Sequence, residues 1–142
     1  MPMSPKQVAE TWFDSVWNRK DPAAIDRYLA PDAKMHGLGD VPMRRDDFKQ
    51  MHQTFCAAFP DIRIEVVRTV CEGDMVVALC HVTGTHGGHG LGGAPTQKRI
   101  DMWGMGMARV ADDRIVEGWN AWDFMTLYQQ VGMLPPPAPP PA

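Results

Sequence analysis

IDMWGMGMARVADDRIVEGWNAWD, residues 100–123, is the segment from which the fold of this chain is best predicted. Large and small side chains alternate along residues 100–110, as they do in a β-strand with two different faces. Asp112-Asp113 then makes a tight turn, and residues 115–123 form the next strand. Strands that are joined by a short turn pair antiparallel, so this segment predicts a β-hairpin.

Two further strands are expected before this hairpin. Residues 62–70 alternate between apolar and polar side chains, and residues 75–85 are almost continuously apolar, with a Gly73-Asp74 turn between them. A glycine-rich segment, residues 84–97, links the second of these strands to the hairpin as a loop. Long strands that follow one another in chain order predict an antiparallel meander.

The first part of the chain has a helical period instead. Ser4 is a fitting N-cap for a first helix, Asp21 for a second, and a third helix spans about residues 46–58. A short strand is expected near residues 34–37, and a short helix over residues 124–131. Helices before a meander predict an α+β fold, in which a curved antiparallel sheet wraps around the N-terminal helices and leaves a cone-shaped cavity.

Composition excludes several classes of partner. Of the 142 residues 44% are hydrophobic, enough for one domain over residues 1–134, and six prolines set residues 135–142 apart as an extended tail. The net charge of −3 offers no basic surface for nucleic acid. No run reaches the ~18 apolar residues of a membrane span, and no signal-peptide core follows the N-terminus, so we expect a cytoplasmic protein.

The three cysteines are expected to be buried small side chains.

The glycine-rich loop contains two motifs that could bind a cofactor or a metal. Gly88-x-Gly90-x-x-Gly93 matches the dinucleotide fingerprint, but that fingerprint needs a helix after it, and Ala94-Pro95 and a strand follow here. His86 and His89, close in sequence to His81, could chelate a metal, although no acidic residue or cysteine lies within the loop as a further ligand. We therefore predict neither a metal nor a cofactor.

Asp123 ends the last strand between aromatic residues. In a regular strand it shares a face with Trp119 and Glu117. Contact with indole rings would desolvate the carboxyl group, raise its pKa and make it a better proton shuttle near neutral pH. The same residue directly precedes residues 124–131, where aspartate is a favoured N-cap. From the residues alone, a general acid/base and a helix cap are equally good interpretations.

His36 ends the short strand and is expected to point into the cavity. Because imidazole titrates near neutral pH, His36 is either a proton partner or a structural hydrogen-bonding group. The tryptophans are candidate walls for a flat ligand, although core packing explains any single one of them better. They are Trp12, Trp17, Trp103, Trp119 and Trp122.

Short motifs mark the chain from its third helix onward. They are Phe59-Pro60-Asp61, Gly73-Asp74-Met75-Val76-Val77, Gly84-Thr85-His86-x-Gly88, Pro95-Thr96, Arg109-Val110-x-Asp112-x-x-Ile115-Val116-Glu117-x-Trp119-x-x-x-Asp123 and Gln130-Val131-Gly132. Together they resemble the SnoaL-like polyketide cyclases of the NTF2-like (cystatin-like) superfamily, over about residues 5–134. The resemblance implies the α+β cone, a mostly apolar pocket, a homodimer built on the outer sheet face, and no metal or cofactor. The chain departs from the family pattern in its last turn and in the loop, which bears on the substrate more than on the fold.

The resemblance also implies a reaction. It is a cofactor-free intramolecular aldol ring closure of a polyketide-type ester, and the family's acid/base aspartate falls on Asp123, which favours the catalytic interpretation of that residue. We therefore predict Asp123 and His36 as catalytic residues. The predicted substrate-binding residues are Trp12, His86, Trp103 and Trp119. The alternatives are a non-catalytic protein that binds a small apolar molecule, and an isomerase or epoxide-hydrolase-like enzyme on an apolar substrate.

Overall fold

The computed structural model describes residues 2–141, so Met1 of the expected domain and Ala142 of the expected tail lie outside the described residues. In chain order the elements are α1 (Pro5–Trp12), the π-helix η1 (Phe13–Asn18), α2 (Pro22–Tyr28), β1 (Leu29–His36), α3 (Arg45–Ala58), β2 (Arg63–Glu72), β3 (Met75–Thr85), β4 (Arg99–Ala111), β5 (Arg114–Trp122) and α4 (Phe124–Gln130). The helices and strands fall close to the predicted ranges, except that β1 begins five residues earlier than expected, at Leu29.

The strands form one sheet in the order β1-β5-β4-β3-β2. The pairs β2–β3, β3–β4 and β4–β5 are antiparallel, as the meander predicted, whereas β1 runs parallel to β5 and sets Leu29 opposite Ile115. The expectation of a wholly antiparallel sheet is therefore wrong, and the sheet is mixed. No turn joins β1 to β5, because α3 and three strands separate them in the chain, so no hairpin dictates their direction.

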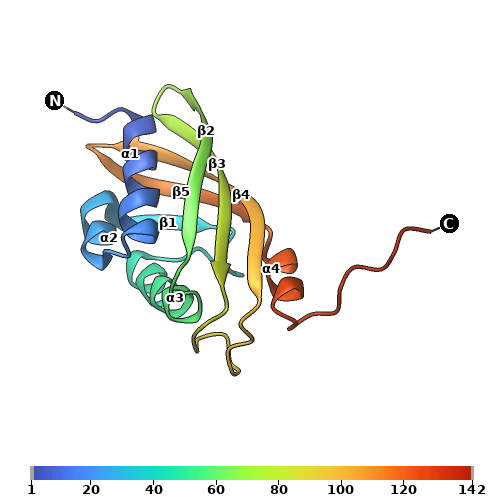
Figure 1. Cartoon of the computed structure of the whole chain (residues 1–142). Helices are drawn as coiled ribbons and strands as arrows, with labels where there is room; N and C mark the ends of the chain where they lie inside the picture. Colours follow the sequence, from blue (N-terminus) through green and yellow to red (C-terminus); the bar gives the residue numbers. More distant parts are fainter. Residues whose placement is uncertain (1, 142) are drawn as a thin grey trace.

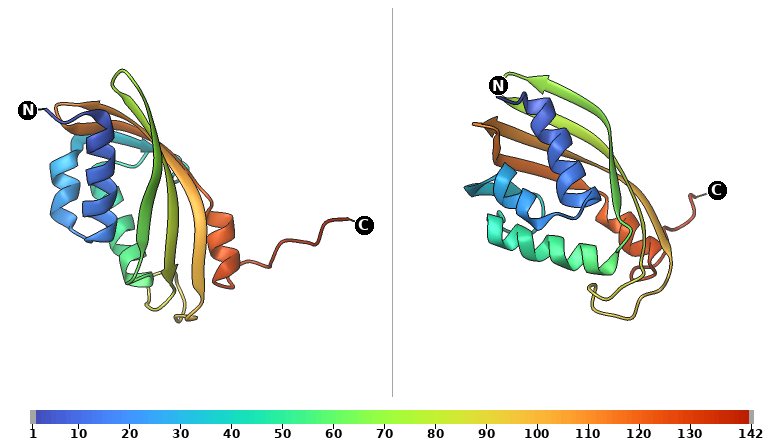
Figure 2. Two further views of the ribbon diagram at one scale, coloured as in Figure 1. Left: turned by 45° about the horizontal axis from the view of Figure 1, so that its top comes forward. Right: turned by 60° about the vertical axis from the view of Figure 1, so that its left-hand side comes forward.

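The helices α1, α2 and α3 cover the inner side of the sheet, and the sheet curves around them (Figures 1 and 2). Along β3 every second side chain is buried beneath these helices. The buried residues are Val76, Ala78, Cys80 and Val82. This arrangement confirms the predicted α+β class, with a curved sheet around the N-terminal helices.

Local sequence signals mark where helices begin or end and where strands turn, as expected. The Ser4 side chain accepts a hydrogen bond from the Gln7 backbone N–H, and the Gln7 side chain accepts one from Ser4, which completes the capping box of α1. Asp112 and Asp113 have φ values of 51° and 62°, the left-handed conformation that a two-residue hairpin turn favours. Gly132, with φ 85°, follows α4 in the same conformation.

The π-helix η1 is not apparent from the sequence. It continues α1 directly, and the N–H of Arg19 bonds to the carbonyl of Asp14, five residues earlier, at 2.8 Å. Such wide turns are rare and are often found at functional sites. Here η1 carries Phe13 and Trp17, both of which are buried on the inner side of the sheet.

Residues 135–141 are exposed and extend away from the sheet (Figure 1). Within residues 2–141, no helix is long and apolar enough to cross a membrane. The expectation that every cysteine is buried holds for Cys80 but is wrong for Cys71, which is exposed on β2, and only partly right for Cys56, which is half-buried on α3.

Candidate binding pocket in the cone

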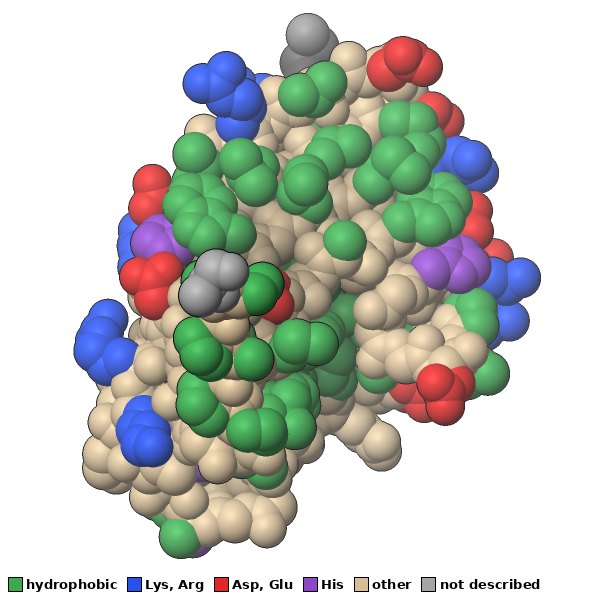
Figure 3. Space-filling model, turned by 90° about the vertical axis from the view of Figure 1, so that its right-hand side faces the viewer, with side chains coloured by type: hydrophobic (Ala, Val, Ile, Leu, Met, Phe, Trp, Pro, Cys, Tyr) green, Lys and Arg blue, Asp and Glu red, His purple; other side chains and the backbone are tan. Residues whose placement is uncertain are grey.

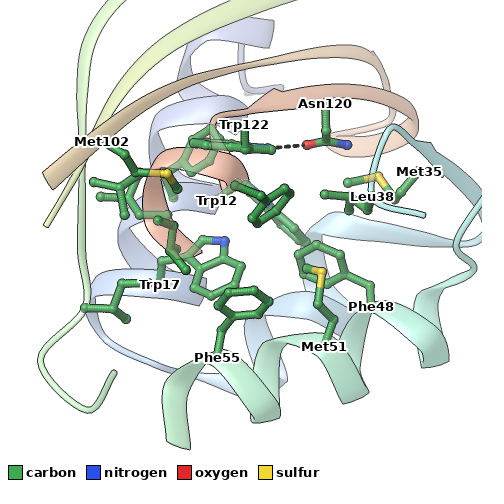
Figure 4. A pocket seen from close by; sticks show the side chains of 16 residues that line it. Trp12, Trp17, Met35, Leu38, Phe48, Met51, Phe55, Met102, Asn120 and Trp122 are labelled. Atoms are coloured by element: carbon green, nitrogen blue, oxygen red, sulfur yellow. Dashed lines mark hydrogen bonds between the residues drawn. The ribbon is translucent and has the colours of Figure 1, made fainter. Parts of the chain in front are cut away.

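A pocket lies between the helices and the inner face of the sheet, lined by sixteen residues (Figure 4). Its cavity volume is about 60 Å³. The lining combines side chains from α1, η1, α3, β2 to β5 and α4 with the segment around β1. These residues are Trp12, Phe13, Trp17, Met35, Leu38, Phe48, Met51, Phe55, Ile62, Ile64, Val82, Met102, Asn120, Trp122, Phe124 and Leu127.

Two tryptophans on the first helical segment form one wall. Trp12 packs on Phe48 with ring centroids 5.3 Å apart, and Trp17 meets the same ring edge-on at 6.2 Å. In a regular α-helix, residues five apart point about 140° away from each other. The wider turn of η1 reduces that angle, so both indoles line the same pocket. The π-helix is therefore part of how this sequence builds the site.

Glycines on β4 make room for the opposite wall. A Cβ atom on Gly104 would collide with the Trp122 indole, and one on Gly106 would lie 3.8 Å from the Phe13 ring. Because glycine leaves the inner face of β4 open, Trp122 lies flat over the strand and meets Phe13 with ring centroids 5.9 Å apart. The small residues of the alternating pattern thus face inward and shape the pocket.

Asn120 supplies the polar group of the lining. Its Oδ1 accepts a hydrogen bond from Trp122 Nε1 at 3.0 Å (Figure 4), and its Nδ2 donates to the His36 carbonyl at 3.0 Å. Within residues 2–141, none of the side chains that line this pocket is ionisable. Sequence reasoning missed Asn120, although its position two residues from Trp122 on a predicted strand would place both on one face.

His52 supports the tryptophan wall from behind. It is 4% exposed, its Nε2 donates to the Val16 carbonyl at 2.6 Å, and its ring lies 4.9 Å from Trp17. Burial lowers the pKa of His52, so the ring stays neutral near pH 7. Cys56 Sγ lies 3.4 Å from the same Nε2, but burial raises the pKa of this thiol. His52 and Cys56 therefore form a neutral supporting pair and not an activated nucleophile.

Asp123 does not have the surroundings predicted for it. Its carboxylate is exposed, and it accepts hydrogen bonds from the backbone N–H of Thr126 at 3.1 Å and from the Thr126 hydroxyl at 2.6 Å. The Thr126 bonds lower the pKa of Asp123, so the expectation of a desolvated carboxyl with a raised pKa is wrong. The strand ends at Trp122, and Asp123 is the N-cap of α4, outside the pocket lining.

His36 is likewise not in the pocket. Its Nε2 donates to Glu117 at 2.7 Å, and its ring stacks on Trp119 at 5.6 Å, which places it with the outward-facing side chains of β5. Arg109 lies over the same indole, 5.9 Å from the ring. The expectation that His36 points into the cavity is wrong because β1 pairs with β5 in the register that sets His36 opposite Trp119.

The predicted substrate-binding residues separate into three groups. Trp12 lines the pocket. Trp103 and Trp119 lie on the outer face of the sheet, and Trp103 is 48% exposed. His86 is buried beside Phe59, with ring centroids 5.6 Å apart, and its Nδ1 accepts hydrogen bonds from Thr96, so it holds the glycine-rich loop rather than lining the pocket.

The histidines considered as metal ligands are also apart. His81 points outward from β3 and donates to Asp101 at 2.7 Å, while His86 follows the end of that strand and is buried. In the described part of the chain, no three residues among His, Cys, Asp and Glu come together as a metal site.

Comparison with known proteins identifies close relatives. The model of a family described as SnoaL-like polyketide cyclase matches residues 7–131. A protein named as a probable cyclase, otaY, from Aspergillus niger is 30% identical over 93 residues, which cover 60% of this chain and 71% of the fungal protein.

Solved structures show the same fold. IdmH of Streptomyces antibioticus, named as a candidate polyketide cyclase, is 30% identical with a TM-score of 0.80, covering 92% of this chain and 99% of its own. AclR of Streptomyces galilaeus, named as a candidate hydroxylase, is 28% identical with a TM-score of 0.84, covering 94% of this chain and 84% of its own. Because these two names differ, the fold alone does not specify the reaction.

Proposed function

Because this chain belongs to the SnoaL-like polyketide cyclase family, we propose that its cone pocket binds a flat, largely apolar polyketide-type molecule and promotes its cyclisation. The lining supports the proposal, because within residues 2–141 it consists of apolar and aromatic side chains with Asn120 as their one amide. Burial of rings against indole and phenyl groups supplies affinity. Beyond its two hydrogen bonds, the Asn120 amide has a further N–H and a further lone pair, which can orient one oxygen of the ligand.

Ring closure in such a pocket depends on the folded conformation of the bound substrate. A flexible chain must bring two distant atoms together, and a rigid site that holds them in contact removes up to about 7–11 kcal/mol of the barrier. Paired aromatic side chains such as Trp12 and Phe48 hold a folded chain through apolar contacts, without an ionisable group. We therefore propose orientation as the main contribution of this protein.

An aldol closure through Asp123 is the second version of this proposal. It needs a base that removes a proton beside a carbonyl. In its favour, both sequence neighbours of Asp123, Trp122 and Phe124, line the pocket. Against it, the carboxylate is exposed and bound to Thr126, and the lowered pKa makes it a weak base. His36, paired with Glu117 on the outer face, has no path to the ligand as a proton partner in this version.

Binding is tested with a naphthalene probe and matched tryptophan variants. Trp12→Ala should weaken binding at least tenfold, because it removes one wall, whereas Trp103→Ala should leave it unchanged, because Trp103 lies on the outer face. Asn120→Ala, which keeps the walls, should weaken binding of 2-naphthol more than that of naphthalene. Equal affinity in the wild type, Trp12→Ala and Asn120→Ala proteins would refute the pocket.

Turnover separates the two versions. A linear aryl diketo ester is incubated with the protein, and its cyclised product is separated by chromatography. Ring closure by orientation predicts that Asp123→Asn keeps the rate, whereas aldol closure through this carboxylate predicts a rate near that without protein. A non-catalytic carrier would bind the ester and give no product. An isomerase is less well supported, because neither Tyr28 nor Tyr128 lines the pocket as an oxyanion donor.

We further propose that two copies pair through the outer sheet face. Hydrophobic side chains gather over this face, with charged and histidine side chains toward its edges (Figure 3). Val70, Trp103 and Met105 are 65%, 48% and 49% exposed there. A two-fold axis over Met105 would set Arg109 of one copy against Asp101 of the other, because these two residues lie four positions on either side of it. Such self-complementarity is what a symmetric dimer requires.

The oligomeric state is measured by sedimentation. Met105→Asp should shift the protein to a monomer, whereas Met125→Asp, at a more exposed methionine on α4, should not. Arg109→Glu should weaken the dimer, and Asp101→Arg in the same chain should restore it. A wild-type protein that sediments as a monomer at every concentration would refute this interface.

A further inference from the structure

A second hollow lies on the outside of the cone, between α3 and the loop that follows β1. Its volume is about 450 Å³, against about 60 Å³ for the cone cavity. Pockets that hold small ligands usually measure roughly 300–1,000 Å³, so the cone alone has room for only part of such a molecule. The residues that line the hollow are Gly39, Asp40, Val41, Pro42, Met43, Asp47, Gln50, Met51 and Thr54.

Met51 stands between the two cavities. It lines both of them, and it is the residue that they share. Figure 4 shows its side chain rising from α3 toward the cone beside Phe48. Methionine is unbranched and adopts many rotamers, so it can move aside at little cost. On the loop, Leu38 lines the cone and its neighbour Gly39 lines the outer hollow.

The loop wall of the hollow is held in place. Met35 and Met43 exchange two backbone hydrogen bonds of 2.9 Å, which close the loop at its base. Gly37, with φ 86°, passes so close to Asn120 that a Cβ atom would collide with its carbonyl oxygen. The loop is therefore anchored at its base and to β5, beside the polar group of the cone.

The hollow differs chemically from the cone. On α3, Asp47, Gln50 and Thr54 lie at positions i, i+3 and i+7, which places them on one face of the helix next to Met51. Asp40 adds a second carboxylate from the loop. Carboxylates only accept hydrogen bonds at neutral pH, so this lining suits hydroxyl or ammonium groups and repels a carboxylate or a phosphate.

We propose that one ligand spans both cavities, with its flat apolar part in the cone and a hydrogen-bond-donating polar end in the outer hollow, and that Met51 is the gate between them. This inference rests on the proposed function of the cone. It names the substrate class more closely, as an amphipathic molecule whose polar end is neutral or cationic. It also excludes a substrate whose anionic end must lie against α3.

Three matched probes test the polar end. Each has a naphthalene ring and a three-carbon chain, which ends in a hydroxyl, an ammonium or a carboxylate, and 2-methylnaphthalene reports on the cone alone. The hydroxyl and ammonium probes should bind about five- to tenfold more tightly than 2-methylnaphthalene, and the carboxylate probe no more tightly. Asp47→Asn should remove most of the preference for ammonium over carboxylate. Asp46→Asn, on the same helical turn but outside the hollow, is the control.

The gate is tested at Met51. Met51→Ala should increase the affinity for the hydroxyl probe at least threefold relative to 2-methylnaphthalene, whereas Met125→Ala, at an exposed residue of α4 that lines neither cavity, should not change that ratio. If 2-methylnaphthalene binds but all three chains add nothing, or Asp47→Asn leaves their order unchanged, the outer subsite is refuted and the cone remains. If 2-methylnaphthalene itself does not bind, both this inference and the proposed function fail.

Discussion

Replacing His52 by phenylalanine tests whether a buried imidazole holds the tryptophan wall. The substitution keeps a ring beside Trp17 but removes the donor to the Val16 carbonyl, a 2.6 Å bond inside the core. A buried carbonyl that loses its partner costs about 1–3 kcal/mol. For a domain of this size, that lowers Tm by roughly 3–9 °C.

The same residue makes stability depend on pH with a defined sign. Burial lowers the pKa of His52 in the folded state, and the nearby Lys20 adds to this effect. The unfolded chain takes up a proton on this ring near pH 6.5, whereas the folded protein does so only at lower pH. The free energy of unfolding should therefore be highest above pH 6.5 and should fall as the pH decreases, by up to about 1.4 kcal/mol per pH unit from this group.

Urea denaturation followed by tryptophan fluorescence at pH 7.5, 6.5 and 5.5 measures both effects. The His52→Phe variant should be less stable than the wild type at pH 7.5, and the difference should shrink toward pH 5.5, because only the wild type loses the histidine contribution. His89→Phe, on the exposed loop, is the control and should keep the wild-type pH slope. Parallel stability curves for His52→Phe and the wild type between pH 7.5 and 5.5 would refute the reasoning.

Three further perturbations follow from the structure. Gly104→Ala places a methyl group against the Trp122 indole and should destabilise the protein by about 1–3 kcal/mol, measured by urea denaturation, with weaker naphthalene binding. Asp123→Ala removes the cap of α4. The Thr126 bonds lower the pKa of this carboxylate in the folded state, so it stabilises the protein above its unfolded pKa of about 4, and this stabilisation is lost as the pH falls below that value. The variant should therefore be less stable than the wild type near pH 7, and its melting temperature should fall less on acidification. His86→Ala frees the Thr96 contacts and should speed amide exchange in the glycine-rich loop but not in β4.

Much of the fold follows from local rules that the sequence displays. The two-residue Asp112-Asp113 turn sets Ala111 opposite Arg114 and Val110 opposite Ile115, and an irregularity beyond Val110 then shifts the register by one residue along the rest of β4. Ser4 caps its helix because its side chain can reach the N–H of Gln7 and no other arrangement satisfies that donor as simply. The direction of β1 could not be predicted in this way, because α3 and three strands separate it from β5 in the chain and no turn joins the two.

The site was harder to predict because a strand has two faces and the sequence does not say which one is covered. Asp123, Trp119 and Glu117 are two or more residues apart and would share a face in an unbroken strand. In the structure the strand ends at Trp122, so Asp123 leaves that series and becomes a helix cap. A longer strand would not have buried it, because Glu117 and Trp119 lie on the outer face and Asp123 would have joined them there.

The inner face of β4 explains why aromatic residues alone were a poor guide to the pocket. A concave sheet has little room inside, and α1, η1 and α3 already fill it with indole and phenyl rings. The strand must therefore offer small residues inward, and Gly104 and Gly106 do so, which leaves Trp103 and Met105 on the outer face. On a curved sheet wrapped around helices, an alternation of glycine with large side chains thus indicates that the glycines face the cavity. The large residues then form the outer surface through which we propose that two copies pair.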